Sequence, residues 1–401
     1  MTHVGVLKAL EEHDIPIDYI TGTSMGAIVG GLYASGYTPD EIEAMVMSDE
    51  MISWLSTAIE PEYKHFFKQS PPTASWQLFK ITLQPDVQVK LPATIVSPFR
   101  MDFGFVELFS GASAAAGYNF DSLYIPFRCV ASDVEKSQPI ILKYGQMEKA
   151  IRASMTFPFY FQPIKIDGRL MFDGGMYNNF PADILTTEFK PDVIIGSKAA
   201  SNYGPPEDDD IISQIQSMLT ANTQYEIDPD SGILITPKLW TVNVTDFSNN
   251  GSFIDSGYMA TKRQIGNIRK FVKRTESVAE KNEKRKVFRA AMPQLTINDI
   301  LFTGVNKSRT EYLERLIRKD KLLSSVNSGE LTAEEIFEAI KLKYFAILSD
   351  DKIESVYPEI IFRNGKYDVI FNVTPSDKME LELGGLISSQ AVNEIFLQLQ
   401  Y

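Results

Sequence analysis

The sequence has little cysteine and little histidine. Its 401 residues include one cysteine and three histidines. A single cysteine excludes an intramolecular disulfide and a cysteine-rich metal site. Because Cys129 falls in an apolar segment, we expect it to be an inert core residue. No histidine follows residue 65, which restricts the catalytic arrangements that the chain could form.

The chain also lacks an excess of positive charge. It has 39 Lys and Arg against 52 Asp and Glu, a formal net charge of −13. Surfaces that bind nucleic acid are basic, so we expect no nucleic-acid partner. The same charge argues against simple electrostatic docking on anionic lipid, and any membrane contact would be local or apolar. There is no apolar run of about 18 residues or more, so no transmembrane helix is predicted, and no signal peptide is visible.

What the chain does contain is enough apolar material for well-filled interiors. The sequence is 44% hydrophobic and 11% aromatic, and its length predicts two or three domains. Strand-like runs at 126–131, 139–142 and 193–195 enclose helical segments such as 147–154. This alternation predicts an α/β fold.

A G-x-S-x-G motif is the most informative feature of the chain. It consists of Gly22, Thr23, Ser24, Met25 and Gly26, between an apolar strand-like run and a helix-like run. A sharp turn from strand to helix holds a serine for attack, and the glycines avoid clashes in that turn. The helix's positive N-terminal end would face an oxyanion formed beside Ser24. The alternative is a glycine-rich turn without chemistry.

A serine nucleophile needs a base. In the α/β-hydrolase order the histidine follows the acid, and this chain has none there, although His3 or His65 could fold back to Ser24. The better candidate is Asp173, which ends an apolar strand-like run and precedes Gly174 and Gly175. Desolvation and a hydrogen bond to the serine would make this carboxylate a usable base. The alternative is that Asp173 merely caps the glycine turn. This chemistry requires no metal and no cofactor.

Several segments mark the organisation of the chain. Residues 50–120 resemble helices and loops packed over a site. The acidic, proline-containing segment 204–210 favours an exposed loop over a calcium loop, because it lacks the glycine and distal glutamate of such loops. A long basic helix is predicted over 255–290, more typical of a solvated helix than of one that meets lipid headgroups. Pro293 then indicates a domain boundary.

Beyond this boundary the pattern is strand, helix, helix, strand, strand over residues 293–375. Thr332 and Glu335 form a capping box for the second helix, and Asn364-Gly365 predicts a tight hairpin between the last two strands. Residues 376–401 alternate polar and apolar side chains, which is typical both of the beginning of a transmembrane β-barrel and of a terminal hairpin on a soluble sheet.

With both motifs identified, residues 1–292 resemble the patatin-like phospholipases, lipid acyl hydrolases that use a Ser-Asp dyad. The stretches that carry the resemblance are 3–10, 22–26, 131–133, 150–155, 173–175 and 178–181. The resemblance implies a three-layer α/β/α hydrolase domain with a mostly parallel central sheet, with Ser24 as nucleophile and Asp173 as base. It also implies that the substrate is a phospholipid or another acyl-ester lipid and that the protein meets a membrane surface. Whether the protein forms a homodimer is left open.

The resemblance further implies an N-terminal strand and a glycine-rich loop whose N–H groups form the oxyanion hole. Both would precede Met1, so the sequence is expected to be cut at this end. The expected function is therefore a phospholipase A or esterase that forms an acyl-enzyme, and the alternative is a catalytically inert truncated or scaffold form.

The remaining segments also resemble known modules. Residues 293–375 are similar to a POTRA module, the small α+β domain that precedes outer-membrane barrels, and residues 376–401 resemble the first barrel strands. Patatin, POTRA and barrel occur together in a bacterial arrangement, which implies a location in the cell envelope, associated with the outer membrane.

Overall fold

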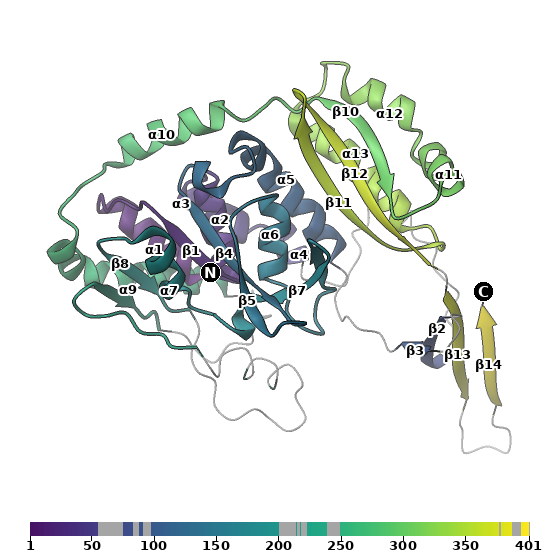
Figure 1. Ribbon diagram of the computed structural model, residues 1–401, viewed down its shortest axis with the longest axis horizontal. Coiled ribbons are helices and arrows are strands. Elements are labelled where there is room, and N and C mark those ends of the chain that lie inside the picture. The colour runs from purple at the N-terminus through teal and green to yellow at the C-terminus, as the bar shows by residue number, and fades with distance from the viewer. Residues whose placement is uncertain are drawn as a thin grey trace. The chain divides into compact units, whose positions relative to one another are not determined.

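A computed structural model of the chain describes residues 1–54, 75–82, 88–90, 98–199, 214, 217, 223–238, 249–376, 378–386 and 394–400. The chain divides into two compact units (Figure 1). The first holds residues 1–56 and 100–293, and the second holds residues 294–401 with strands β2 (Ser75–Thr82) and β3 (Gln88–Lys90). The division falls directly after Pro293, while the predicted three-part domain organisation stays a prediction. His65, segment 204–210 and most of 55–97 lie outside the described residues.

A five-stranded sheet forms the centre of the first unit. Its order is β1 (Ile20–Thr23), β4 (Phe127–Asp133), β7 (Arg169–Asp173) and β6 (Ile164–Ile166), and β5 (Gln138–Leu142) also pairs with β4. Every residue of β4 is buried, as expected for a strand covered on both faces. Cys129 on β4 is fully buried, which confirms it as a core residue.

The prediction of a mostly parallel central sheet is wrong for this sheet. Only β1 and β4 pair in parallel, whereas β4 pairs antiparallel with both β5 and β7, and β6 pairs antiparallel with β7. For the pairs β4–β5 and β6–β7 the reason lies in the connections, because only a few residues separate the two strands of each pair. Such short links close hairpins, while parallel neighbours need a crossover of a dozen residues or more. A separate parallel pair is formed by β8 (Ile194–Ser197) and β9 (Gly232–Ile235).

Helices pack against the central sheet. Helix α2 (Met25–Ala34) contacts β1, β4 and α6 (Met147–Ser154), and α7 (Ala182–Phe189) contacts β1. From Ala27 to Ala34 every residue of α2 is buried, so this helix lies inside the unit. Helix α1 (Thr2–Glu12) precedes β1, and a capping box at Thr38 starts α3 (Pro39–Val46). Helices α4 (Asp49–Ser53) and α5 (Phe99–Ala115) follow.

The predicted single basic helix over 255–290 is two helices, α9 (Asn250–Phe271) and α10 (Val278–Ala290). The break has a local cause, because Val272 is extended and Ser277 with Glu280 forms a capping box that starts α10. On α10 the buried residues are Lys281 and Arg285. Arg285 pairs with Glu11 and lies over the ring of Tyr33, so this face of the helix is packed rather than solvated.

The second unit contains a three-stranded sheet covered by helices (Figure 1). Strand β12 (Lys366–Pro375) lies between β10 (Ile297–Thr303), its parallel neighbour, and β11 (Ile353–Arg363), its antiparallel neighbour. The hairpin at Asn364-Gly365 is present with positive φ at both residues, and the capping box at Thr332 starts α13 (Ala333–Leu348). The predicted order omits a helix, because α12 (Lys319–Val326) follows α11 (Lys307–Ile317) after a left-handed residue, Arg318. The likeness to a POTRA module stays a prediction.

The last two strands, β13 (Lys378–Leu386) and β14 (Glu394–Gln400), form an antiparallel pair. Strand β13 also pairs with β2, and β2 with β3, so that a four-stranded sheet results. Antiparallel pairing is common to both interpretations of residues 376–401, so the choice between them stays open.

Candidate active site

The elbow at Ser24 joins β1 to α2 through a strained residue. Ser24 has φ 53° and ψ −118°, a backbone conformation that residues other than glycine rarely adopt. A Cβ atom on Gly22 would lie 2.3 Å from the carbonyl oxygen of Gly26, so the turn closes only with glycine at that position. The motif thus has the sharp strand-to-helix geometry that its sequence predicts, and Ser24 lies directly between the end of β1 and the start of α2.

Asp173 reaches the same place from the other side of β4. It is the last residue of β7 and pairs with Ala131, while Thr23 pairs with Val130 on the opposite edge of β4. The Asp173 N–H donates to the carbonyl of Thr156 at 2.8 Å, and its own carbonyl accepts from Ser132 Oγ at 2.7 Å. These bonds hold the backbone of Asp173 at the end of the strand, with its side chain directed toward the elbow.

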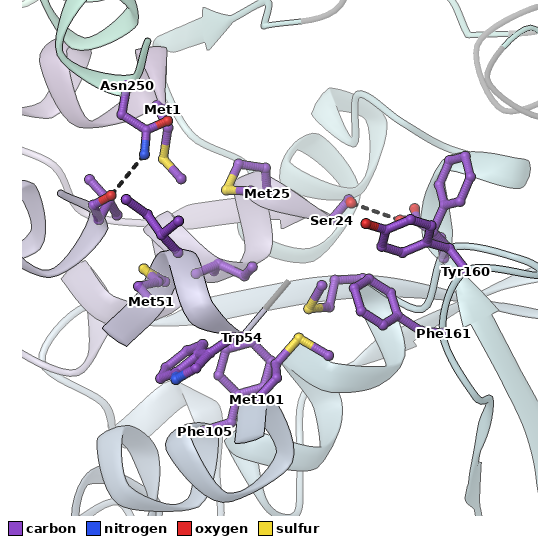
Figure 2. A pocket seen from close by; sticks show the side chains of 16 residues that line it. Met1, Ser24, Met25, Met51, Trp54, Met101, Phe105, Tyr160, Phe161 and Asn250 are labelled. Atoms are coloured by element: carbon purple, nitrogen blue, oxygen red, sulfur yellow. Dashed lines mark hydrogen bonds between the residues drawn. The ribbon is translucent and has the colours of Figure 1, made fainter. Parts of the chain in front are cut away.

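The two side chains meet in a direct hydrogen bond. Ser24 Oγ donates to Asp173 Oδ2 at 2.7 Å, drawn as a dashed line in Figure 2. The second carboxylate oxygen, Oδ1, accepts from the N–H of Gly175 at 2.8 Å. Asp173 therefore both caps the glycine turn and contacts Ser24, so the two readings of this residue are compatible. Burial of the carboxylate, which is 3% exposed, raises its pKa to about 6.

Ser154 supports the turn at Ser24 through hydrogen bonds, a role that the sequence analysis did not predict. Its hydroxyl accepts a hydrogen bond from the Ser24 N–H at 3.0 Å and donates to the carbonyl of Val130 at 2.6 Å. It is the last residue of α6 and fully buried. The only sequence signal was its place in the stretch 150–155, which carried the family resemblance. Ser154 thereby ties the strained residue to the central strand.

The described histidines lie away from the pair. His3 is half-buried and its Nδ1 hydrogen-bonds Ser197 Oγ at 2.8 Å, while Nδ1 of His13 hydrogen-bonds the carbonyl of Ala9. Desolvation, with a smaller contribution from the N-terminal charge, lowers the pKa of His3 to about 3. Among the described residues, Asp173 is therefore the titratable group in contact with the Ser24 hydroxyl, and an arrangement through His3 is not formed.

A largely apolar cavity of about 100 Å³ opens beside the pair (Figure 2). Its remaining lining residues share apolar character except for Asn250, and they are Met1, Met25, Ile28, Val46, Met51, Ile52, Trp54, Met101, Phe105, Met155, Phe157, Tyr160, Phe161 and Asn250. Buried surface of this kind suits a hydrocarbon chain more than a polar substrate. In the described part of the chain no cluster of acidic, histidine and cysteine side chains is arranged to hold a metal ion, and no helix is long and apolar enough to cross a membrane.

The fold and this geometry define an α/β protein with a serine on a sharp strand-to-helix turn, in contact with a buried carboxylate. Comparison with known proteins agrees, since residues 1–186 match the patatin-like phospholipase family and form a patatin-like phospholipase domain. That span includes Ser24, Ser154 and Asp173.

Curated relatives give the same result. The chain is 30% identical over 186 residues to a patatin-like phospholipase domain-containing protein of Caenorhabditis elegans, 28% over 192 residues to patatin-like phospholipase domain-containing protein 6 of Mus musculus, and 27% over 210 residues to a lysophospholipase of Candida albicans. These matches cover 46%, 46% and 51% of this chain but only 11%, 11% and 13% of the respective relatives. The chain thus spans a small part of these relatives, and they support lipid hydrolase activity only for the matched domain.

Proposed function

We propose that the first unit is a serine lipid acyl hydrolase in which Ser24 is the nucleophile and Asp173 the general base. The observation that carries this proposal is the 2.7 Å hydrogen bond from Ser24 Oγ to a carboxylate whose pKa is raised to about 6. A base with that pKa is ionised at neutral pH and still accepts a proton more readily than an ordinary aspartate.

In the proposed reaction Ser24 Oγ attacks the ester carbonyl while Asp173 Oδ2 takes its proton. The proton then passes to the leaving alcohol, and an acyl-serine remains. Water, deprotonated by the same carboxylate, attacks the acyl-serine and restores the free hydroxyl. Because one carboxylate contacts the serine directly, no histidine relay is needed.

The first turn of α2 supplies donors for the oxyanion. No described residue accepts a hydrogen bond from the N–H of Met25 or of Gly26. Both groups belong to the positive end of the helix next to Ser24 Oγ. Oxyanion donors of this kind contribute about 100- to 1,000-fold each to the rate. The apolar cavity would hold the acyl chain, in keeping with the phospholipid substrate implied by the family.

Labelling with a fluorophosphonate probe tests the nucleophile. We expect the chain to be labelled at one residue and the Ser24→Ala variant to be unlabelled, since the probe reacts only with an activated serine. Ser324→Ala, which alters an exposed serine of α12 in the second unit, is the matched control and should be labelled like the parent. Absence of label in the parent chain would contradict the proposal and favour the inert scaffold.

The pH dependence of hydrolysis follows from the raised pKa of Asp173. Activity requires the carboxylate to be ionised, so kcat/KM for a p-nitrophenyl ester should fall about tenfold per pH unit below pH 6 and be level above about pH 7. An aspartate with its ordinary pKa near 3.8 would instead sustain activity down to about pH 4. A profile that is flat between pH 4 and pH 7 would show that the base does not have a raised pKa, which would contradict the buried Asp173 carboxylate proposed here.

The predicted outer-membrane location, the contact with a membrane surface and the homodimer are not established by the fold or by the relatives. They stay predictions that follow from the resemblance alone.

A further inference from the structure

An exposed aromatic turn borders the cavity that contains Ser24. The segment 157–163 reads Phe-Pro-Phe-Tyr-Phe-Gln-Pro and follows α6. Phe157, Tyr160 and Phe161 line the cavity, and Figure 2 shows Tyr160 beside the hydrogen bond between Ser24 and Asp173. Phe159, at the tip of the same turn, is 64% exposed. One short segment therefore lines the pocket and presents a large apolar side chain to the outside.

This turn is held in a fixed shape. The N–H groups of Tyr160 and Phe161 both donate to the carbonyl of Phe157, at 3.2 and 3.1 Å. Arg152 donates to the carbonyl of Gln162 at 2.8 Å and lies over the ring of Phe161. Phe159 has φ 62°, a left-handed conformation that is unfavourable for an aromatic residue. An exposed phenylalanine kept in a strained position gains nothing from the core, so its presence calls for an external contact.

The cavity has a second apolar side at its opening. Ile52, a residue of helix α4, lines the same cavity and is 41% exposed. Ile52 and the turn 157–163 thus both contribute apolar surface to this cavity. No residue of that turn is charged, and the net charge of the chain is −13. The turn itself therefore suits an uncharged or zwitterionic partner, because it carries no basic residue that would attract an anionic one.

We propose that Phe159 anchors the mouth of this cavity on the surface of a zwitterionic phospholipid bilayer. The inference rests on the proposed function, because a lipid acyl chain must leave an aggregate to reach Ser24. Exposing each methylene of an acyl chain to water costs free energy. Direct contact between the apolar side chains at the cavity and the bilayer lets the acyl chain pass from the lipid into the cavity without that exposure. Aromatic side chains are well suited to this interfacial depth.

Replacing Phe159 with glycine tests the anchor without endangering the fold, because glycine adopts the positive φ of this position readily. We expect Phe159→Gly to lower the partition of the full chain onto phosphatidylcholine vesicles about tenfold or more, measured by co-sedimentation. Hydrolysis of a dissolved p-nitrophenyl butyrate should be unchanged, whereas hydrolysis of vesicle phospholipid should fall with binding. Tyr144→Gly is the matched control, because Tyr144 is 61% exposed but does not line the cavity.

The outcomes separate the anchor from the chemistry. Equal vesicle binding by the parent and Phe159→Gly, or an equal loss in Tyr144→Gly, would overturn the anchor whatever the activity. Loss of binding by Phe159→Gly alone would support it, even in a chain that hydrolyses no ester. A second variant, Phe159→Trp, should show an added blue shift of tryptophan emission with phosphatidylcholine vesicles. Binding that occurs only when phosphatidylglycerol is included would contradict the zwitterionic surface.

Discussion

Replacing Asp173 with asparagine is expected to lower kcat for p-nitrophenyl ester hydrolysis about 1,000-fold or more. Asparagine keeps the shape of the side chain and can still accept the hydrogen bond from Gly175, but it cannot take a proton from Ser24. The loss should appear in kcat rather than KM, since the amide leaves the apolar cavity unchanged. Steady-state kinetics of the purified variant measure both constants.

The control for this variant is Asp167→Asn. Asp167 lies in the turn between β6 and β7, is exposed and has φ 51°, which asparagine tolerates well. We expect it to retain the activity of the parent. If Asp173→Asn kept more than about a tenth of the parent kcat, general-base catalysis by this carboxylate would be excluded, because loss of a general base lowers the rate by about 100-fold or more.

Replacing Arg152 with methionine is expected to lower the free energy of unfolding by about 3–5 kcal/mol. Arg152 is fully buried, and its Nε donates to Asp102 Oδ1 at 2.6 Å, with Asp102 itself only 4% exposed. Burial raises the pKa of Asp102, and the Arg152 charge opposes that shift. Removing the arginine therefore leaves a buried carboxylate without its partner. Urea denaturation followed by circular dichroism measures the change.

The double variant Asp102→Asn with Arg152→Met separates charge from packing. With the carboxylate replaced by a neutral amide, no uncompensated charge remains, and we expect part of the lost stability to return. If the double variant were no more stable than Arg152→Met alone, the ion pair would not be the source of the effect. Arg152 also contacts Thr156, whose carbonyl accepts the Asp173 N–H, so the single variant should lose activity together with stability.

Features that depend on neighbouring residues were predicted correctly. The capping box at Thr332, the hairpin at Asn364-Gly365 and the turn at Ser24 are all present. Each is specified by the backbone preferences of two to five consecutive residues, so the sequence suffices to predict it. Helix α12 and the break between α9 and α10 were missed, although the Ser277 and Glu280 capping box was a readable signal for the break.

The strand directions of the central sheet and the contact that supports Ser24 could not be predicted without the tertiary structure. The strand directions around β4 depend on which strands meet in space, and periodicity within one strand carries no such information. The role of Ser154 depends on a contact with Ser24 across 130 positions of the chain. Arg152 and Asp102, separated by 50 positions, form their buried pair for the same reason.

The sequence by itself determined that a serine would sit on a strained turn and that an aspartate would end a strand before two glycines, because local backbone sterics dictate both. It also excluded a histidine beyond residue 65. Only the tertiary structure decided that Ser24 and Asp173, 149 positions apart, lie within 2.7 Å, and that burial raises the carboxylate's pKa. Distance and desolvation are properties of the packed core, in which β4 brings the ends of β1 and β7 together and the carboxylate of Asp173 is buried.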